Sequence, residues 1–152
     1  MFRSVFDGAN DWVLQCDLRN KQQPFPPHIL VTTDRPDIVV FSNSTKRVII
    51  IELTCPVEEN LEKWREEKRN KYSRLAEAIE GAGSWKATVM TIEVGARGFV
   101  SKAVRSTCMR MGLDHKKTGT MVREMSRMAI RCSHFIWINR ENKTWETPMM
   151  DI

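Results

Sequence analysis

RPDIVVFSNSTKRVIIIELT, residues 35–54, is the stretch of sequence that decides the fold. Its two apolar segments, Ile38–Phe41 and Arg47–Thr54, are rich in β-branched residues, which is typical of buried strands. The segment between them, Ser42–Lys46, is polar and typical of a turn. We therefore predict a hairpin of two buried strands.

The segments on either side extend this hairpin into a sheet. On its N-terminal side we predict a strand at Trp12–Leu18 and a second, short one at His28–Thr32. On its C-terminal side Pro56 ends the hairpin, and a helix is predicted from Val57 to about Ala82. Its apolar residues recur with a period of about 3.6 and are Leu61, Trp64, Tyr72, Leu75 and Ile79. The alternating segment Trp85–Val94 predicts a further strand.

Two more helices are predicted in the C-terminal third of the chain. Ser101 is a suitable N-cap for a helix to about Met111, and Thr118 or Thr120 opens a last helix to about Ile138. One face of this last helix, expected to make core or dimer contacts, carries Met121, Met125, Met128, Cys132 and Phe135. The order of elements predicts one α/β domain over residues 1–152, with a small mixed sheet in a core of about residues 11–105 and a basic helical part at about 101–140.

Two carboxylates interrupt the apolar pattern of the hairpin. Glu52 lies within VIIIELT, where a charged side chain is costly unless it is paired or binds a metal ion. Asp37 lies directly before the other strand, so hairpin pairing brings both acids to the same end of adjacent strands. Two converging carboxylates suit Mg²⁺. Alternatively, Glu52 forms a salt bridge with Arg35 or Arg47, and Asp37 caps a turn.

A lysine interrupts the apolar face of the first predicted helix. With a rotation of about 100° per residue, Lys68 falls within about 20° of Leu61 and Ile79. A lysine that points toward the core needs an anionic partner, and Asp37 with Glu52 would supply one. The alternative is that the Lys68 stem is buried while its ammonium reaches water at the sheet edge. Lys71, at the border of the same face, is the second candidate.

The net charge of +5 is unevenly distributed along the chain. Residues 1–96 contain 13 Lys and Arg against 14 Asp and Glu, whereas residues 97–143 contain 11 against three, and the tail from Thr144 adds two acids. A basic C-terminal half is typical of proteins that bind an anionic polymer. Arg123, Arg127 and Arg131 recur every four residues and form a stripe that either follows a DNA backbone or is a solvated face.

Cysteine spacing and hydropathy exclude several classes of protein. The four cysteines lie far apart without a CxxC pair, which argues against a zinc site and a disulfide framework. No apolar run approaches the roughly 18 residues of a membrane span, and no secretory signal is recognisable. We therefore expect an intracellular protein without a membrane partner.

Three blocks of the sequence resemble the PD-(D/E)XK, or restriction-endonuclease-like, nuclease superfamily. The blocks are FPPHILVTTDRPDIVV, ELTCPVEENLEKWREEKRNKYSRL and IEVGARGFV, and the resemblance covers about residues 11–105. Their sequences are similar to those of the endonuclease domains of site-specific non-LTR retrotransposons and of the stand-alone relatives of those elements. The resemblance implies an αβββαβ core, dependence on Mg²⁺ or Mn²⁺, and cleavage of DNA phosphodiester bonds.

Carried onto this chain, the resemblance makes Asp37 and Glu52 the metal ligands. The lysine that usually follows two positions after the second acid is replaced here by Thr54. In the retrotransposon type a helix supplies the lysine, with a tyrosine one turn later, and that spacing matches Lys68 and Tyr72. The expected catalytic set is therefore Asp37, Glu52, Lys68 and Tyr72.

The sequence favours a metal-dependent DNA endonuclease. The first alternative is a catalytically inactive nucleic-acid-binding module on the same fold, and the second is an unrelated globular scaffold whose acidic pair is structural. Arg35 and Arg97 are further candidates for contact with phosphates, although Arg35 could pair with an acid and Arg97 lies in a glycine-bounded turn. DNA is the expected partner in a nuclear protein; RNA as the substrate and a homodimer as the assembly stay open.

Overall fold

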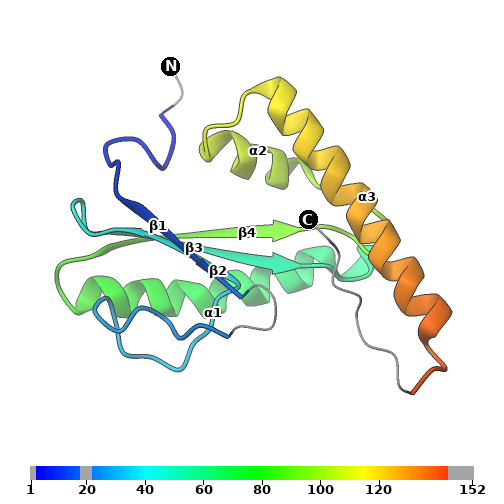
Figure 1. The fold of residues 1–152 in the computed structure, drawn as a ribbon, viewed down its shortest axis with the longest axis horizontal. Helices are drawn as coiled ribbons and strands as arrows, with labels where there is room; N and C mark the ends of the chain where they lie inside the picture. Colours follow the sequence, from blue (N-terminus) through cyan, green and yellow to red (C-terminus); the bar gives the residue numbers. More distant parts are fainter. Residues whose placement is uncertain (1–2, 18–21, 144–152) are drawn as a thin grey trace.

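The computed structural model describes residues 3–17 and 22–143, which form a mixed α/β domain (Figure 1). One sheet holds four strands in the order β1-β2-β3-β4. Its strands and the helices are β1 (Trp12–Cys16), β2 (Ile38–Ser42), β3 (Arg47–Thr54), the short 3-10 helix η1 (Glu58–Asn60), α1 (Leu61–Gly81), β4 (Lys86–Glu93), α2 (Lys102–Arg110) and α3 (His115–Asn139).

The sheet is mixed, as predicted. β1 pairs with β2 and β2 with β3 in antiparallel fashion, whereas β3 and β4 are parallel and are connected by the crossover helix α1. The predicted hairpin forms at β2–β3, with Ser42 opposite Arg47 and Ile38 opposite Ile51. Lys46 in its turn takes a positive φ of 52°. This register brings the residue before β2 next to the C-terminal end of β3.

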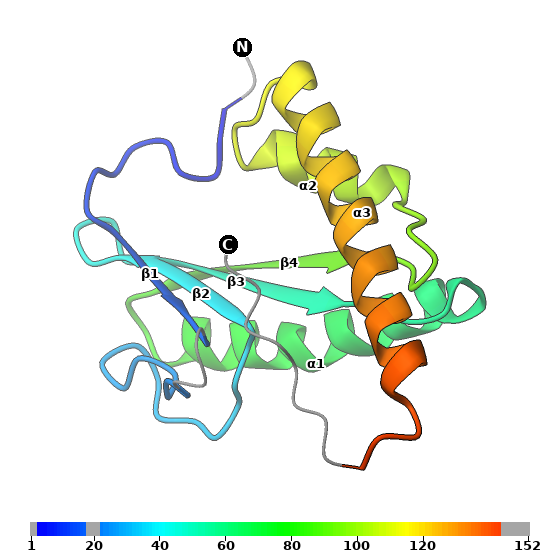
Figure 2. The same ribbon diagram turned by 45° about the vertical axis from the view of Figure 1, so that its right-hand side comes forward.

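Strand alternation divides the core into two layers (Figures 1 and 2). α1 covers one face of the sheet, whereas α2 and α3 lie on the other. On the α1 side the sheet residues Val48 and Ile50 pack with the helix residue Ile79, and all three are fully buried. On the other side Ile49 and Met90 pack with α2 and α3. Full burial of each aliphatic side chain contributes about 1.5–3 kcal/mol.

The segment before the hairpin differs from the prediction. His28–Thr32 is not a strand, because residues 27–29 form a turn in which the amide of Ile29 donates to the carbonyl of Pro26 over 3.0 Å. Phe25 and Ile29 are buried beneath the sheet, so their apolar character serves a packed loop and not a strand. The first strand ends at Cys16; the predicted end, Leu18, lies outside the described residues.

The last helix begins earlier and packs through a different face than predicted. Asp114 is the N-cap, and its carboxylate accepts the Lys117 amide over 2.7 Å, so α3 starts at His115. The buried residues of α3 are Thr118, Val122 and Ala129, whereas Met121 and Met128 are about two-fifths exposed. Small and β-branched residues of α3 line its contact with α2 and the core on that side; Met125 packs against the same core, whereas Met121 and Met128 lie at its margin.

Two further expectations need correction. The resemblance implied a helix before the first strand, but residues 3–11 contain a turn and no helix. Trp64, on the apolar face predicted for the first helix, is 39% exposed. The four cysteines are free, as the sequence predicts. Within the described part of the chain no helix is long and apolar enough to cross a membrane.

Candidate functional site

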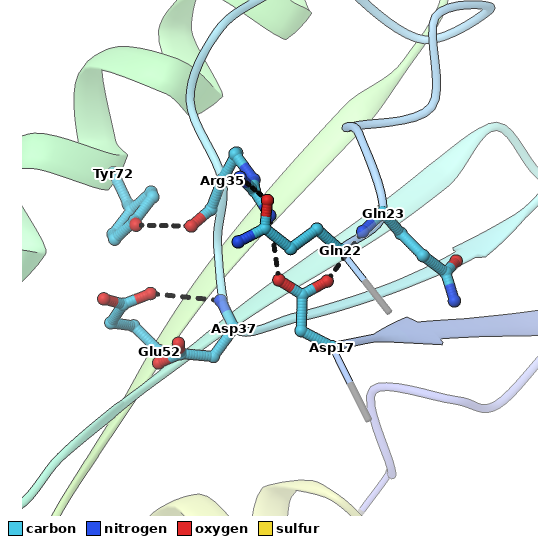
Figure 3. Close-up of polar contacts among 7 residues, drawn as sticks. All are labelled: Asp17, Gln22, Gln23, Arg35, Asp37, Glu52 and Tyr72. Atoms are coloured by element: carbon cyan, nitrogen blue, oxygen red, sulfur yellow. Dashed lines mark hydrogen bonds and ion pairs between the residues drawn. The ribbon is translucent and has the colours of Figure 1, made fainter. Parts of the chain in front are cut away.

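Asp37 and Glu52 meet at the end of the β2–β3 hairpin (Figure 3). The amide of Asp37 donates to Glu52 Oε2 over 3.3 Å, and the amide of Leu53 donates to Asp37 Oδ2 over 2.8 Å. Both acids project toward the face covered by α1, since Val39 and Ile50 share their alternation and pack there. The sequence-based pairing of the two carboxylates is therefore realised in the fold.

Lys68 is the cationic partner of Glu52. Its ammonium forms a short ion pair with Glu52 Oε1, and the Glu52 side chain is only 3% exposed while that of Lys68 is 30% exposed. The alternative partners of Glu52 are engaged elsewhere: Arg47 donates to the backbone carbonyls of Val5 and Asp7, and Arg35 pairs with Asp17. Lys68 thus compensates the buried carboxylate and still reaches solvent.

Lys71 and Tyr72 lie beside this pair. Lys71 is exposed, and its ammonium lies 3.2 Å from the Tyr72 hydroxyl, not on a carboxylate. Tyr72 is fully buried, and its hydroxyl donates to the backbone carbonyl of Arg35 over 3.3 Å. Burial and then the charge of Glu52 raise the pKa of Tyr72 well above its ordinary value, so its hydroxyl remains a donor. The geometry makes Tyr72 a support of the segment that carries Asp37.

Replacing Tyr72 by phenylalanine tests this supporting position. The variant loses one buried hydrogen bond to the Arg35 carbonyl but keeps the ring in the core. We expect the free energy of unfolding to fall by about 1 kcal/mol. Urea denaturation would measure the loss, and an unchanged midpoint would show that the hydroxyl does not contribute to stability.

The electrostatics of Asp37 favour a cation. Burial, and further the negative charge of Glu52, raise the pKa of Asp37 above its ordinary value of 3.8, against the opposing effects of the Leu53 amide and Lys68. One ammonium faces two carboxylates, so the pair carries more negative charge than its surroundings compensate. A divalent cation would relieve this excess.

The raised pKa of Asp37 gives a pH-dependent prediction. Folding favours the protonated acid, so its contribution to stability is complete below the unfolded pKa of 3.8 and is lost as pH rises through the folded pKa. In EDTA, the Asp37→Asn variant should therefore gain stability relative to wild type as pH rises toward neutrality. Urea denaturation between about pH 4 and 8 checks this, and parallel stability profiles would contradict it.

The donor set at the hairpin end fits a magnesium-type site of low protein ligation. Among residues 3–17 and 22–143, no three His, Cys, Asp or Glu side chains converge on one point, so Asp37 and Glu52 are the two acidic ligands available. Mg²⁺ commonly uses one or two carboxylates and completes its octahedron with water and substrate phosphate. Asp37 and Glu52 would hold such an ion, and water and substrate phosphate would complete its coordination shell.

The remaining candidates from the sequence lie apart from this pair. Arg35 is held at the surface by Asp17 at 3.1 Å and by Gln22 at 3.0 Å (Figure 3). Arg97 is bound by two carboxylates, at 2.9 Å from Glu58 and 2.6 Å from Glu59.

The arginine stripe of α3 is exposed along its length. Its members are Arg123, Arg127 and Arg131. Arg127 forms a surface pair with Glu124 at 3.2 Å, and Arg123 donates to the Thr120 hydroxyl over the same distance. Surface pairs of this kind contribute about 0–1 kcal/mol, so they leave the cations available to a ligand.

Glu93 is a buried carboxylate near the site that the sequence reasoning missed. It pairs in register with Thr54, is only 2% exposed, and neither of its carboxylate oxygens has a hydrogen-bond partner within the described residues. Alternation places it on the same face of the sheet as Glu52. The signal was present in TVMTIEV, where a carboxylate interrupts an apolar strand as Glu52 does.

No protein-family model matches this chain, and no characterised protein matches it. A function is therefore indicated by the chemistry of the site alone.

Proposed function

We propose that the protein is a divalent-metal-dependent endonuclease that hydrolyses DNA phosphodiester bonds. The observation that carries this proposal is the convergence of Asp37, Glu52 and Lys68 from two adjacent strands and one helix. Two carboxylates and one ammonium, partly open to solvent, are a set suited to metal-assisted phosphodiester hydrolysis. Mg²⁺ is the preferred ion, with Mn²⁺ as its substitute.

Each side chain of the site has a separate role in such a reaction. A divalent ion bound by Asp37 and Glu52 would supply Lewis-acid activation of the phosphate and of the attacking water. Lys68 donates hydrogen bonds from its ammonium to that water or to the phosphate oxygen on which negative charge develops. Glu52 fixes the direction of Lys68 through their ion pair, and Tyr72 supports the backbone before Asp37.

The order of elements supports membership in the PD-(D/E)XK superfamily as part of this proposal. A hairpin that carries the two acids is followed by a crossover helix that carries the lysine, and then by a parallel strand. Thr54, not a lysine, follows Glu52 by two positions, and Lys68 from α1 stands in for the missing ammonium. A DNA substrate agrees with the exposed arginines of α3, and we expect a nuclear location.

Nicking of supercoiled plasmid tests the proposal. Wild-type protein should convert supercoiled to open-circular DNA in Mg²⁺ or Mn²⁺, and EDTA should stop the reaction. Asp37→Ala should be inactive under both metals while it still binds DNA. If wild type and Asp37→Ala both bind DNA and neither cuts it, the protein is the inactive binding module instead.

A further inference from the structure

A second polar site lies on the opposite side of β4 from the hairpin. A pocket of about 340 Å³ opens where α1, β4 and α2 meet, lined by Val89, Met90 and Thr91 of the strand and by residues of both helices. β4 is the last strand of the sheet, so its outer edge faces this pocket. In Figure 1, α2 lies above β4 and α1 below it.

Three arginines give the pocket its charge. Arg65 and Arg69 lie one turn apart on α1, and Arg110 enters from the last turn of α2. None of the residues that line the pocket is an Asp or Glu. Such a concentration of guanidinium groups without acids is unfavourable unless an anion compensates it.

These arginines are free to bind a ligand. Arg69 and Arg110 are exposed, and neither forms an ion pair or side-chain hydrogen bond within the part of the chain that the structure describes. Arg65 has one partner, Glu62, at 3.5 Å, and that glutamate is 85% exposed. Such a surface pair is weak, so it offers little competition to a bound anion.

The remaining polar groups of the pocket are hydroxyls. Thr91 of β4 and both Ser106 and Thr107 of α2 line the same space as the arginines. Guanidinium forks and hydroxyl donors together match the oxygens of a phosphate group. The volume is larger than a single phosphate requires, which suits a phosphate that is part of a chain.

Register connects this pocket to the metal ligands. Thr91, which lines the pocket, is the register partner of Glu52 in the parallel pair β3–β4. Neighbouring strands lie about 4.8 Å apart, so one strand width separates the backbone of the two sites. On α1, Lys68 at the metal site precedes Arg69 at the pocket by one residue. A single nucleic-acid strand can therefore contact both.

We propose that this pocket binds backbone phosphates of the DNA strand on one side of the bond that is cut. This inference rests on the proposed endonuclease function, for which it supplies a positioning site. Arg65, Arg69 and Arg110 hold the strand through charge and hydrogen bonds, and the scissile phosphate then lies at Asp37 and Glu52.

The salt dependence of DNA binding tests the pocket without any cleavage step. Anisotropy of a fluorescent duplex, titrated in EDTA at several salt concentrations, gives the slope of log affinity against log salt. Each lost phosphate contact should reduce this slope by about 0.9, so Arg69→Ala/Arg110→Ala should reduce it by about two units. Arg69→Lys/Arg110→Lys, which keeps both charges, should restore most of the slope.

A matched control removes the same charge elsewhere. Lys63 and Lys86 are exposed and outside the pocket, so Lys63→Ala/Lys86→Ala should leave the slope within about 0.5 of wild type. Equal slopes for the two double variants would overturn the proposal. If the two slopes are equal and wild type still cleaves DNA, the pocket proposal fails but the nuclease function stands. If the slope falls only in the pocket variant and wild type does not cleave DNA, the nuclease function fails but the pocket still binds DNA.

Competition by free phosphate distinguishes the source of the anion. Inorganic phosphate should weaken wild-type DNA binding more than sodium chloride of equal ionic strength, and Arg69→Ala/Arg110→Ala should lose this difference, because both anions would occupy one site. Calorimetric binding of inorganic phosphate that the double variant loses, together with a salt slope of DNA binding that it leaves unchanged, would assign the pocket to a free anion and overturn the proposal.

Discussion

Replacement of Glu52 by glutamine is expected to lower the rate of plasmid nicking by about 10³-fold or more. A metal ion supplies several kcal/mol of transition-state stabilisation, and about 4 kcal/mol corresponds to a factor of about 1,000 in rate. Glutamine keeps the size of the side chain and an oxygen that accepts from Lys68, but it removes the charge that holds the ion. The fold should therefore survive while the activity does not.

The control for this variant makes the same chemical change on the surface. Glu77 lies exposed on α1, so Glu77→Gln should nick plasmid at the wild-type rate. Single-turnover rates in Mg²⁺, with circular dichroism to verify folding, give the comparison. More than a tenth of wild-type activity in Glu52→Gln would remove Glu52 from the metal site.

Lys68→Met should destabilise the metal-free protein by about 2–3 kcal/mol. Loss of one partner of a buried ion pair commonly costs about 3–5 kcal/mol, and the partial exposure of Lys68 places the expected loss at or below the lower end. Glu52 then remains buried without its cation. Mg²⁺ binding to the folded state should return part of the lost stability, and more than it adds to wild type.

Lys71→Met separates the two candidate lysines. Lys71 is exposed and adjacent to Tyr72, and no carboxylate pairs with it among residues 3–17 and 22–143, so its replacement should change stability by less than about 0.5 kcal/mol. Urea denaturation with EDTA and with Mg²⁺ would measure both variants. If Lys71→Met proved the more destabilising and also abolished nicking, the functional lysine would be Lys71.

Local patterns in the sequence predicted the hairpin and the core of the site. Glu52 interrupts a continuous apolar strand and Lys68 interrupts an apolar helix face with a period near 3.6 residues, and the fold brings the two side chains into contact. Asp37 follows from the hairpin register. These features could be predicted because each depends on residues close together in sequence.

Other features depend on how distant elements pack. The apolar segment at His28–Thr32 resembles a strand, but Pro26 and Pro27 before it favour a turn, and Ile29 is buried from that turn. The buried face of α3 is set by its packing against α2 and the core on that side, where Ala129 is buried and the larger Met128 is exposed. The arginine pocket requires β4 to be an edge strand with α2 packed beside it, which no local pattern reveals.

A titration with Mn²⁺ tests the metal site most directly. Binding is monitored by the decrease in the electron paramagnetic resonance signal of the free ion. The protein is titrated in the presence of a DNA duplex whose phosphodiesters are replaced by a cleavage-resistant analogue. Wild type should bind Mn²⁺ at a saturable site that Asp37→Asn/Glu52→Gln lacks. Equal binding by the two proteins, or no saturable binding by wild type, would contradict the assignment of Asp37 and Glu52 as metal ligands.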